Sequence, residues 1–199
     1  MLSEMEHRIK NLFAVASSMV RVSARSATSP SGLATAVCAQ LNALASAHAL
    51  TLARPIADDS VEEPATTLHS LIRTILSPYD GKVDSASCFT LTGPDPRVSG
   101  NAITHLALLL YEFATNAAKY GSLSMPSGRI EVECTARADR YTVVWRERGG
   151  PAIVAPNAEG FGTTLMEATA RQLDADLSRD FGPTGLTVRV TLSADRLSD

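Results

Sequence analysis

This chain of 199 residues has few cysteines, a small net charge and no long apolar run. The three cysteines, Cys38, Cys88 and Cys134, are far apart and odd in number, so neither a zinc site nor a disulfide framework is expected. The number and spacing of the cysteines favour a reducing, cytoplasmic setting. A net charge of −3 provides no basic patch for nucleic acid. No apolar stretch approaches the roughly 18 residues of a membrane-spanning helix, and the first residues lack the apolar core of a signal peptide.

The composition is that of a globular protein, with 45% hydrophobic and 20% charged residues. The length allows one large domain, or one domain with an appendage. We find no internal repeat and no low-complexity segment.

The N-terminal part predicts a helical hairpin. Apolar residues recur at helical spacing over residues 2–27, residues 29–32 break the pattern, and a second helix is expected over residues 33–52. Two helices joined by so short a loop lie antiparallel. The hairpin alone has too little core, so two copies forming a four-helix bundle, hence a homodimer, is the simplest expectation. The alternative is that the hairpin packs back on the rest of the chain.

The pattern changes after residues 54–64, which are polar and contain proline, as a linker would. Helices are expected at residues 68–76, 101–120 and 163–173, and strands at 88–91, 129–135, 141–147, 177–181 and 186–192. The expected fold class is α+β: a hairpin domain at 1–53, the linker at 54–64, and an α/β sandwich with a mixed sheet at 65–199.

The helix expected at residues 101–120 has a polar side near its end. The helical spacing places four residues on that side, namely Glu112, Asn116, Lys119 and Tyr120. A carboxylate, an amide oxygen and a lysine there could hold a magnesium ion and a nucleotide phosphate, because magnesium prefers hard oxygen ligands and keeps much of its water. A solvated helix face remains the alternative.

The first predicted helix carries His7 near its start. An imidazole that attacks a γ-phosphate needs one nitrogen unprotonated and exposed. Glu4 lies one turn before His7 and could accept the proton of the other ring nitrogen, while Arg8 and Lys10 could attract phosphate. A plain surface histidine is the alternative.

Two glycine-containing segments follow the strand expected at residues 141–147. Glu147 ends that strand, and the glycines Gly149 and Gly150 behind it allow a ligand to approach the backbone closely. The second segment precedes a helix whose N-terminus could bind phosphate; its residues are Gly160, Gly162 and Thr163. Alone, the first segment is equally a glycine-rich turn beside an edge-strand glutamate.

These blocks, in this order, resemble the histidine kinases of two-component signalling, and most closely the HWE subgroup with its relative, the second HisKA-type family. The resemblance covers nearly the whole chain. It makes residues 4–14 the phosphoacceptor box, 40–50 part of the second dimerisation helix, 111–121 the N box, and 145–151 and 160–163 the G boxes. It implies a dimerisation hairpin followed by a Bergerat-type (GHKL) ATP-binding domain.

The resemblance also implies roles for these residues. His7 would be the phosphorylated residue, Asn116 the magnesium ligand, and Glu112 the base or water-positioning residue. Lys119 and Tyr120 would contact phosphate or nucleotide. Glu147 matches the carboxylate that accepts a hydrogen bond from the adenine amino group, and the glycines and Thr163 complete the nucleotide site.

The implied function is ATP- and magnesium-dependent autophosphorylation of His7, followed by phosphoryl transfer to an aspartate of a response regulator receiver domain. The receiver should dock on the hairpin near His7. Because the chain begins almost at the phosphoacceptor helix, any input domain is expected to be missing or on another protein. The lid between the G boxes, residues 152–159, is short, as in this subgroup.

The chain departs from the HWE pattern at one position. The subgroup is named HWE after a histidine, a tryptophan and a glutamate. Tyr111 stands at the position of the histidine, whereas Trp145 and Glu147 match the tryptophan and the glutamate. Any role that needs an imidazole there is lost. This favours one alternative, a histidine phosphotransfer protein with a degenerate ATP site. A third hypothesis is an ATP-binding module of the same broad fold, such as a protein serine kinase, in which the hairpin has no purpose.

Overall fold

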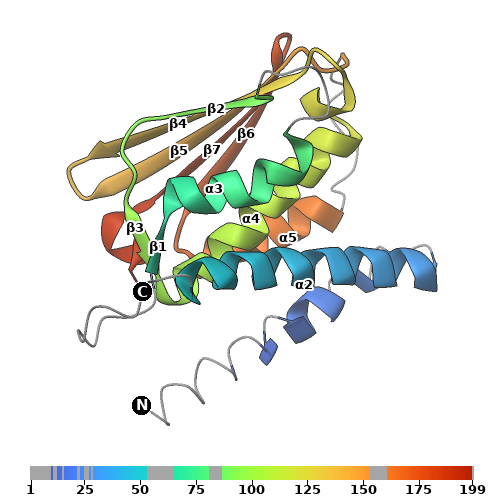
Figure 1. Cartoon of the computed structure of the whole chain (residues 1–199), viewed down its shortest axis with the longest axis horizontal. Helices are drawn as coiled ribbons and strands as arrows, with labels where there is room; N and C mark the ends of the chain where they lie inside the picture. The colour runs from blue at the N-terminus through green and yellow to red at the C-terminus, as the bar shows by residue number, and fades with distance from the viewer. Residues whose placement is uncertain are drawn as a thin grey trace.

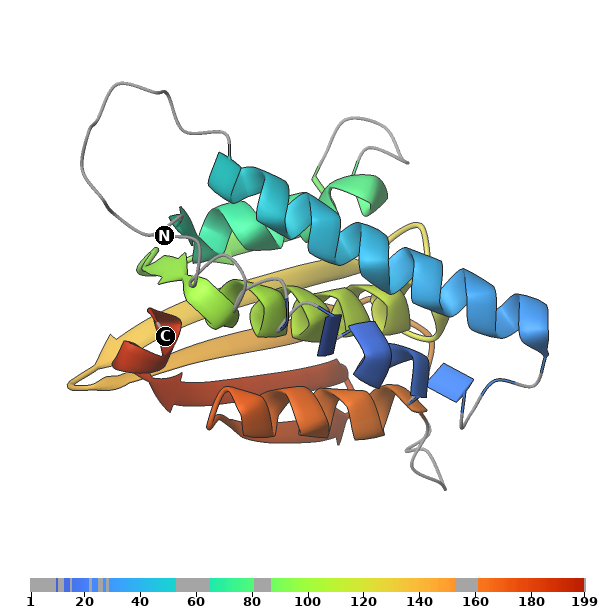
Figure 2. The same ribbon diagram turned by 90° about the horizontal axis from the view of Figure 1, so that it is seen from below.

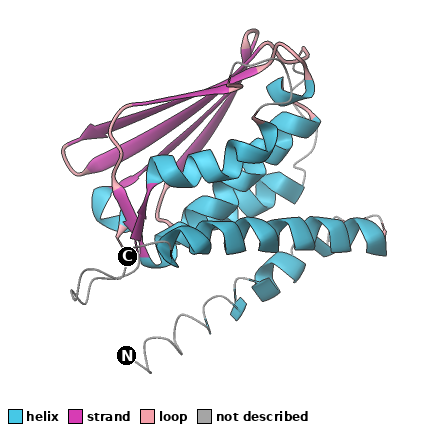
Figure 3. Ribbon diagram, in the orientation of Figure 1, coloured by secondary structure: helices cyan, strands magenta, loops and turns pink. Residues whose placement is uncertain are grey.

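The fold is a sheet covered on one face by helices, with a further helix outside them (Figures 1 and 3). The computed structural model describes residues 10, 13–14, 16–21, 23–24, 27, 29–52, 65–80, 87–152 and 161–198. Predictions that involve Glu4, His7, Arg8 and Gly160 lie outside these residues, as do the linker and most of the lid.

The main sheet has five strands in the order β2-β4-β5-β7-β6. Its members are β2 (Phe89–Thr92), β4 (Arg129–Arg137), β5 (Arg140–Arg148), β6 (Asp176–Gly182) and β7 (Gly185–Ser193). β2 is parallel to β4, and every other pair is antiparallel. The sheet is therefore mixed, as expected.

The strands bury one face through residues two positions apart, as strand geometry requires. On β5 the buried residues of this face are Tyr141, Val143, Trp145 and Glu147. The register places Trp145 opposite Val132 of β4 and Val188 of β7, both buried. Glu147 is thus the one charged side chain in this inward row of β5.

Three helices cover that face: α3 (Leu68–Leu76), α4 (Gly100–Lys119) and α5 (Phe161–Gln172). Figure 2 shows α4 between the other two, with α2 (Pro30–Leu52) lying across the helical layer. The Thr67 hydroxyl caps α3 by accepting a hydrogen bond from the Ser70 N–H. α4 lies in the middle of the helical layer, and most of its residues, including Leu106, Leu109 and Phe113, are therefore buried.

α2 forms from a stretch that is rich in alanine and contains no charged residue. Pro30 occupies its first turn, and the Ser29 hydroxyl accepts a hydrogen bond from the Gly32 N–H, so the start of the helix is capped. The buried stripe of α2 consists of Gln40, Ala43, Leu44 and Ala47. This stripe faces α3 and α4 of the same chain.

The expected α+β class, N-terminal helices followed by a mixed-sheet sandwich, is confirmed. α2, the second helix of the predicted hairpin, packs on α3 and α4 of the same chain, which favours the alternative in which the hairpin folds back. The homodimer and the domain boundaries at 53 and 65 remain predictions. The sequence patterns did not predict the two-stranded antiparallel sheet of β1 (Ala65–Thr67) and β3 (Arg97–Ser99).

Candidate functional site

The polar residues near the end of α4 differ in their surroundings. Glu112 is buried, Asn116 is half-buried and Lys119 is exposed. Tyr120 follows the helix as its C-cap and is 74% exposed. The structure therefore leaves Asn116, Lys119 and Tyr120 open to a ligand, and it turns Glu112 towards the interior.

Glu112 is held by the helix that crosses α4. The Gln40 amide Nε2 on α2 donates a hydrogen bond of 2.9 Å to Glu112 Oε1. The Ser23 hydroxyl in turn donates to Gln40 Oε1 at 3.4 Å. All three side chains are buried, so a polar chain runs from the N-terminal helical residues through α2 to the N box. Sequence spacing gave no signal for it, because Gln40 and Glu112 are 72 positions apart.

The surroundings of Glu112 set its acidity. Burial raises the pKa of the carboxyl, while the hydrogen bond from Gln40 and the charge of Lys119 lower it. Tyr111 beside it is half-buried, and burial, followed by the proximity of Tyr79 and Glu112, raises its pKa to about 12. Tyr111 is therefore a neutral phenol at physiological pH.

The end of α4 meets the end of β5. The Glu147 carboxylate accepts a hydrogen bond of 2.7 Å from the backbone N–H of Ser122, just after the helix. Gly149 has φ of +68°, in the left-handed region that favours glycine, and a Cβ there would lie 2.9 Å from the Ser127 carbonyl oxygen. Two segments predicted as separate motifs, the N box and the first G box, thus lie side by side.

The second glycine segment is described only from residue 161, where α5 begins. Thr163 is buried, and its hydroxyl accepts a hydrogen bond of 2.7 Å from Arg179 Nη1 on β6. Arg179 also lies 3.6 Å from Glu167 of α5. Gly162 is within α5, and Thr163 is engaged with the sheet in this structure. Arg179 was missed by sequence analysis because a single arginine on a strand carries no motif.

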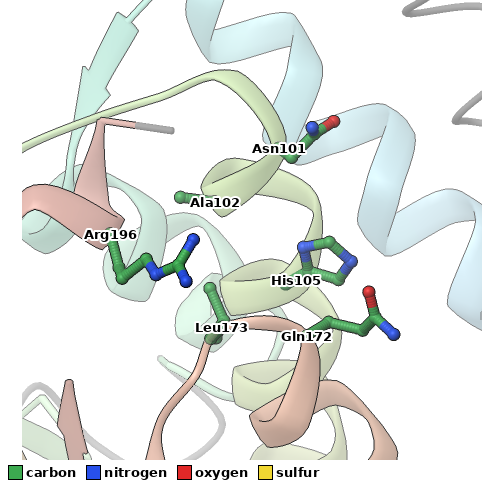
Figure 4. Close-up of a pocket in the computed structure, with 6 residues that line it drawn as sticks. All are labelled: Asn101, Ala102, His105, Gln172, Leu173 and Arg196. Carbon is green, nitrogen blue, oxygen red and sulfur yellow. The ribbon is translucent and has the colours of Figure 1, made fainter. Parts of the chain in front are cut away.

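A cavity of about 320 Å³ lies at the opposite end of α4. Its polar lining comes from α4, α5 and the 3-10 helix η3 (Ala194–Leu197), and Figure 4 shows the side chains of His105, Gln172 and Arg196 around the opening. None of the predicted site residues lines it. Burial lowers the pKa of His105, against a smaller opposite effect of its hydrogen bond with the Asn101 backbone.

We expect His105 to make the free energy of unfolding decrease as the pH falls below neutral. A group whose pKa is lower in the folded state stabilises the protein above its unfolded pKa, here 6.5, and that stability is lost as pH falls through the folded value. We expect the wild type to lose more free energy of unfolding than His105→Gln between about pH 7.5 and about pH 5. Urea denaturation at both pH values measures this, and equal losses in the two proteins would contradict it.

Two kinds of feature are absent from the described part of the chain. Among those residues, no helix is long and apolar enough to cross a membrane. The same residues include no cluster of three or more histidine, cysteine, aspartate or glutamate side chains able to hold a metal ion. A magnesium ion bound mainly through phosphate and one amide oxygen does not require such a cluster.

Comparison with known proteins shows a similarity to histidine kinases. The family described as HWE histidine kinase matches residues 4–95. Blue-light-activated histidine kinase 1 of Erythrobacter litoralis is 33% identical over 193 residues, which are 96% of this chain and 52% of that protein. By these matches the chain is similar to the HWE histidine kinases, over residues 4–95 in the family comparison and over nearly its whole length in this relative.

A second relative has a similar name and a similar degree of identity. A blue-light-activated histidine kinase of Rhizobium johnstonii is 32% identical over 195 residues, covering 96% of this chain and 52% of the relative. The chain thus spans about half the length of the curated relatives it matches.

The solved structures support the fold. The histidine kinase domain of an Erythrobacter litoralis blue-light activated kinase superposes with a TM-score of 0.68 at 20% identity, covering 99% of this chain and 97% of that one. The catalytic domain of the histidine kinase ThkA gives a TM-score of 0.52 at 16% identity, covering 68% and 99%. The first match extends over the N-terminal helices as well as the sandwich.

Proposed function

We propose that this chain is the kinase core of a two-component histidine kinase, which phosphorylates its own His7 from ATP and passes the phosphoryl group to an aspartate of a response regulator receiver domain. The observation that carries the proposal is the meeting of the N box and the first G box at Ser122 and Glu147. This contact brings Asn116, Lys119 and the glycine turn to one end of the sandwich, as a nucleotide site built from these motifs requires.

The residues at this end fit ATP and magnesium. Asn116 offers an amide oxygen, and the exposed Lys119 offers an ammonium group that can reach phosphates. Gly149 and Gly150 provide backbone without side chains, and Gly160, Gly162 and Thr163 belong to the phosphate-binding segment in this proposal. Magnesium bound at Asn116 would neutralise charge on the triphosphate.

In the proposed reaction an unprotonated imidazole nitrogen of His7 attacks the γ-phosphorus. A nitrogen–phosphorus bond forms as the bond to the oxygen of ADP breaks, and ADP leaves. Glu4 accepts the proton of the other ring nitrogen and orients the ring, and Arg8 attracts the phosphates. Catalysis is mainly positioning and electrostatic stabilisation. The role of base or water-positioning residue proposed for Glu112 rests on the resemblance, since in the structure its carboxylate is buried and accepts a hydrogen bond from Gln40.

A second candidate is a histidine phosphotransfer protein, and Tyr111 is the observation that favours it. With its pKa raised to about 12, this phenol cannot take over proton transfer from an imidazole. The phosphotransfer protein would accept a phosphoryl group at His7 from a receiver domain without using ATP.

The deciding experiment is incubation with magnesium and ATP labelled at the γ-phosphate. We expect acid-labile label on the wild type and none on His7→Ala or Asn116→Ala, because the first lacks the acceptor and the second the metal ligand. Matched controls are His105→Gln and Asn42→Ala, which lie outside the proposed site and should be labelled. An unlabelled wild type that accepts label from a phosphorylated receiver domain would establish the phosphotransfer protein instead.

A further inference from the structure

Arg179 is a charged residue in a cross-strand row of the main sheet that is otherwise apolar. The register places Arg179 of β6 opposite Val188 of β7, and Val188 opposite Trp145 of β5, and both of these neighbours are buried. Residues directly opposite one another on paired strands point to the same face, so Arg179 lies at the edge of the helix-covered face. Its side chain is 22% exposed. A guanidinium that has lost most of its water is unfavourable unless specific contacts replace that water.

The contacts of Arg179 go to two successive turns of α5, which lies beside this edge of the sheet (Figure 2). Nη1 donates a hydrogen bond of 2.7 Å to the Thr163 hydroxyl, and Nη2 lies 3.6 Å from Glu167 Oε1. Thr163 and Glu167 are four residues apart and therefore share one face of the helix. Thr163 is 8% exposed, so the hydrogen bond to it is shielded from water. Arg179 thus fastens the first turn of α5 to β6.

The electrostatics at the start of α5 favour an anion. The N-terminus of a helix carries a partial positive charge, which acidic side chains in the first turn commonly offset. The first turn of α5 contains no acidic residue, and Arg179 adds a positive charge beside it. Glu167, one turn further along and 40% exposed, offsets only part of this charge. An anion that reaches the N–H groups of the first turn would therefore be stabilised.

The same turn belongs to the phosphate-binding segment of the proposed function, which consists of Gly160, Gly162 and Thr163. Backbone N–H groups bind phosphate well only when the turn that carries them is held in place, since ordering it during binding costs free energy. Thr163 is the member of this segment whose side chain is fixed to the sheet, and Arg179 is the residue that fixes it.

We propose that Arg179 is a positioning residue for the phosphates of the nucleotide. It holds Thr163, and with it the first turn of α5, so that the backbone N–H groups of this turn face the phosphates. It acts through Thr163 and does not itself contact phosphate. The inference rests on the proposed function for its ligand, whereas the contact between Arg179 and α5 can be measured without nucleotide.

The first test uses the full chain without nucleotide. Arg179→Met keeps an unbranched side chain in the apolar row, and Thr163→Val keeps the shape of the threonine, but each removes the hydrogen bond. We expect both variants to speed amide hydrogen exchange in α5 by about three- to tenfold, because the loss of this bond lets its first turn open more often. Unchanged exchange in both variants would overturn the contact.

Arg140→Met is the matched control. Arg140 also contacts a residue of β6, with Nη2 at 2.6 Å from Asp176 Oδ2, but the pair is exposed and involves no residue of α5. Its replacement should leave the exchange of α5 and the affinity for ATP unchanged.

The second test measures nucleotide affinity by titration calorimetry. We expect Arg179→Met to weaken ATP binding by about three- to tenfold and to leave adenosine, which has no phosphate, unchanged. Arg179→Lys should lose less, because its ammonium group can still donate to Thr163. The unfolding temperature of Arg179→Met should stay within about 4 °C of the wild type, since an apolar side chain suits this row. Equal weakening of ATP and adenosine, or a lower unfolding temperature with unchanged ATP affinity, would overturn the inference.

A double substitution separates positioning from direct phosphate contact. If Arg179 acts through Thr163, the variant with both Arg179→Met and Thr163→Val should bind ATP as weakly as the weaker single variant, within about twofold. Losses that multiply would show that the two residues act independently, and the inference would be wrong. A wild type that binds no ATP would refute the proposed nucleotide site and the role of Arg179 in it, while the exchange measurement would still decide whether Arg179 holds α5.

Discussion

Replacing Trp145 by alanine is expected to lower the free energy of unfolding by about 3–5 kcal/mol. The side chain is 1% exposed and lies between the sheet and α4, where its ring centroid is 5.7 Å from that of Phe113 with the planes tilted by 58°. The substitution loses the apolar burial and the aromatic contact, and leaves a cavity between the layers. Urea denaturation followed by far-UV circular dichroism measures the loss, since the variant has no tryptophan fluorescence.

Phe181→Ala is the matched control. Phe181 is also an aromatic residue of the sheet, but it lies on the edge strand β6 and is 38% exposed. We expect a loss of less than about 1 kcal/mol, because little buried surface disappears and no closed cavity forms. Equal losses in the two variants would show that Trp145 does not support the layer contact described above.

Gln40→Leu is expected to lower the free energy of unfolding by about 1.5–3 kcal/mol at neutral pH. The leucine fits the volume of the glutamine but leaves the buried Glu112 carboxylate without its donor from α2. Because this hydrogen bond lowers the pKa of Glu112, its removal raises the pKa further above the ordinary value of 4.5. The loss of free energy of unfolding should therefore be largest at pH values where Glu112 is ionised. It should become smaller as the pH falls towards 4.5 and the carboxyl takes up a proton.

Asn42→Leu provides the control for this prediction. Asn42 lies on the exposed side of α2, so its replacement should change stability by no more than about 0.5 kcal/mol at any of these pH values. Urea denaturation of both variants at about pH 7.5 and about pH 5 gives the comparison. A loss in Gln40→Leu that does not depend on pH would mean that the glutamine contributes through packing rather than through the carboxylate.

The regular elements could be predicted because their apolar residues repeat with the period of a helix or strand. α4 and β5 each have enough buried positions for this, and their predicted bounds differ from the observed ones by one residue. β1 and β3 have three residues each, too few for any period to show. Their pairing depends on where the rest of the fold brings residues 65–67 and 97–99 together.

The membership of the candidate site remains a prediction, and the internal arrangement of its described residues could not be predicted from the sequence. Helical spacing correctly places Glu112 one turn before Asn116, yet it does not say that α2 crosses there with a glutamine. Likewise, the position of Glu147 at a strand end does not reveal whether its carboxylate points to a ligand or to the Ser122 peptide. Such contacts depend on tertiary packing between segments 25 and 72 positions apart, which local patterns do not record.

The packing of α2 on α4 has a thermodynamic consequence. If nucleotide binds more tightly when Gln40 holds Glu112 than when α2 has moved away, then bound nucleotide must favour the docked position of α2 by the same factor. This equality holds for binding at equilibrium whatever route the structural change takes. A protein that draws α2 off the sandwich would thus expel nucleotide, and nucleotide would compete with that protein although the two never touch.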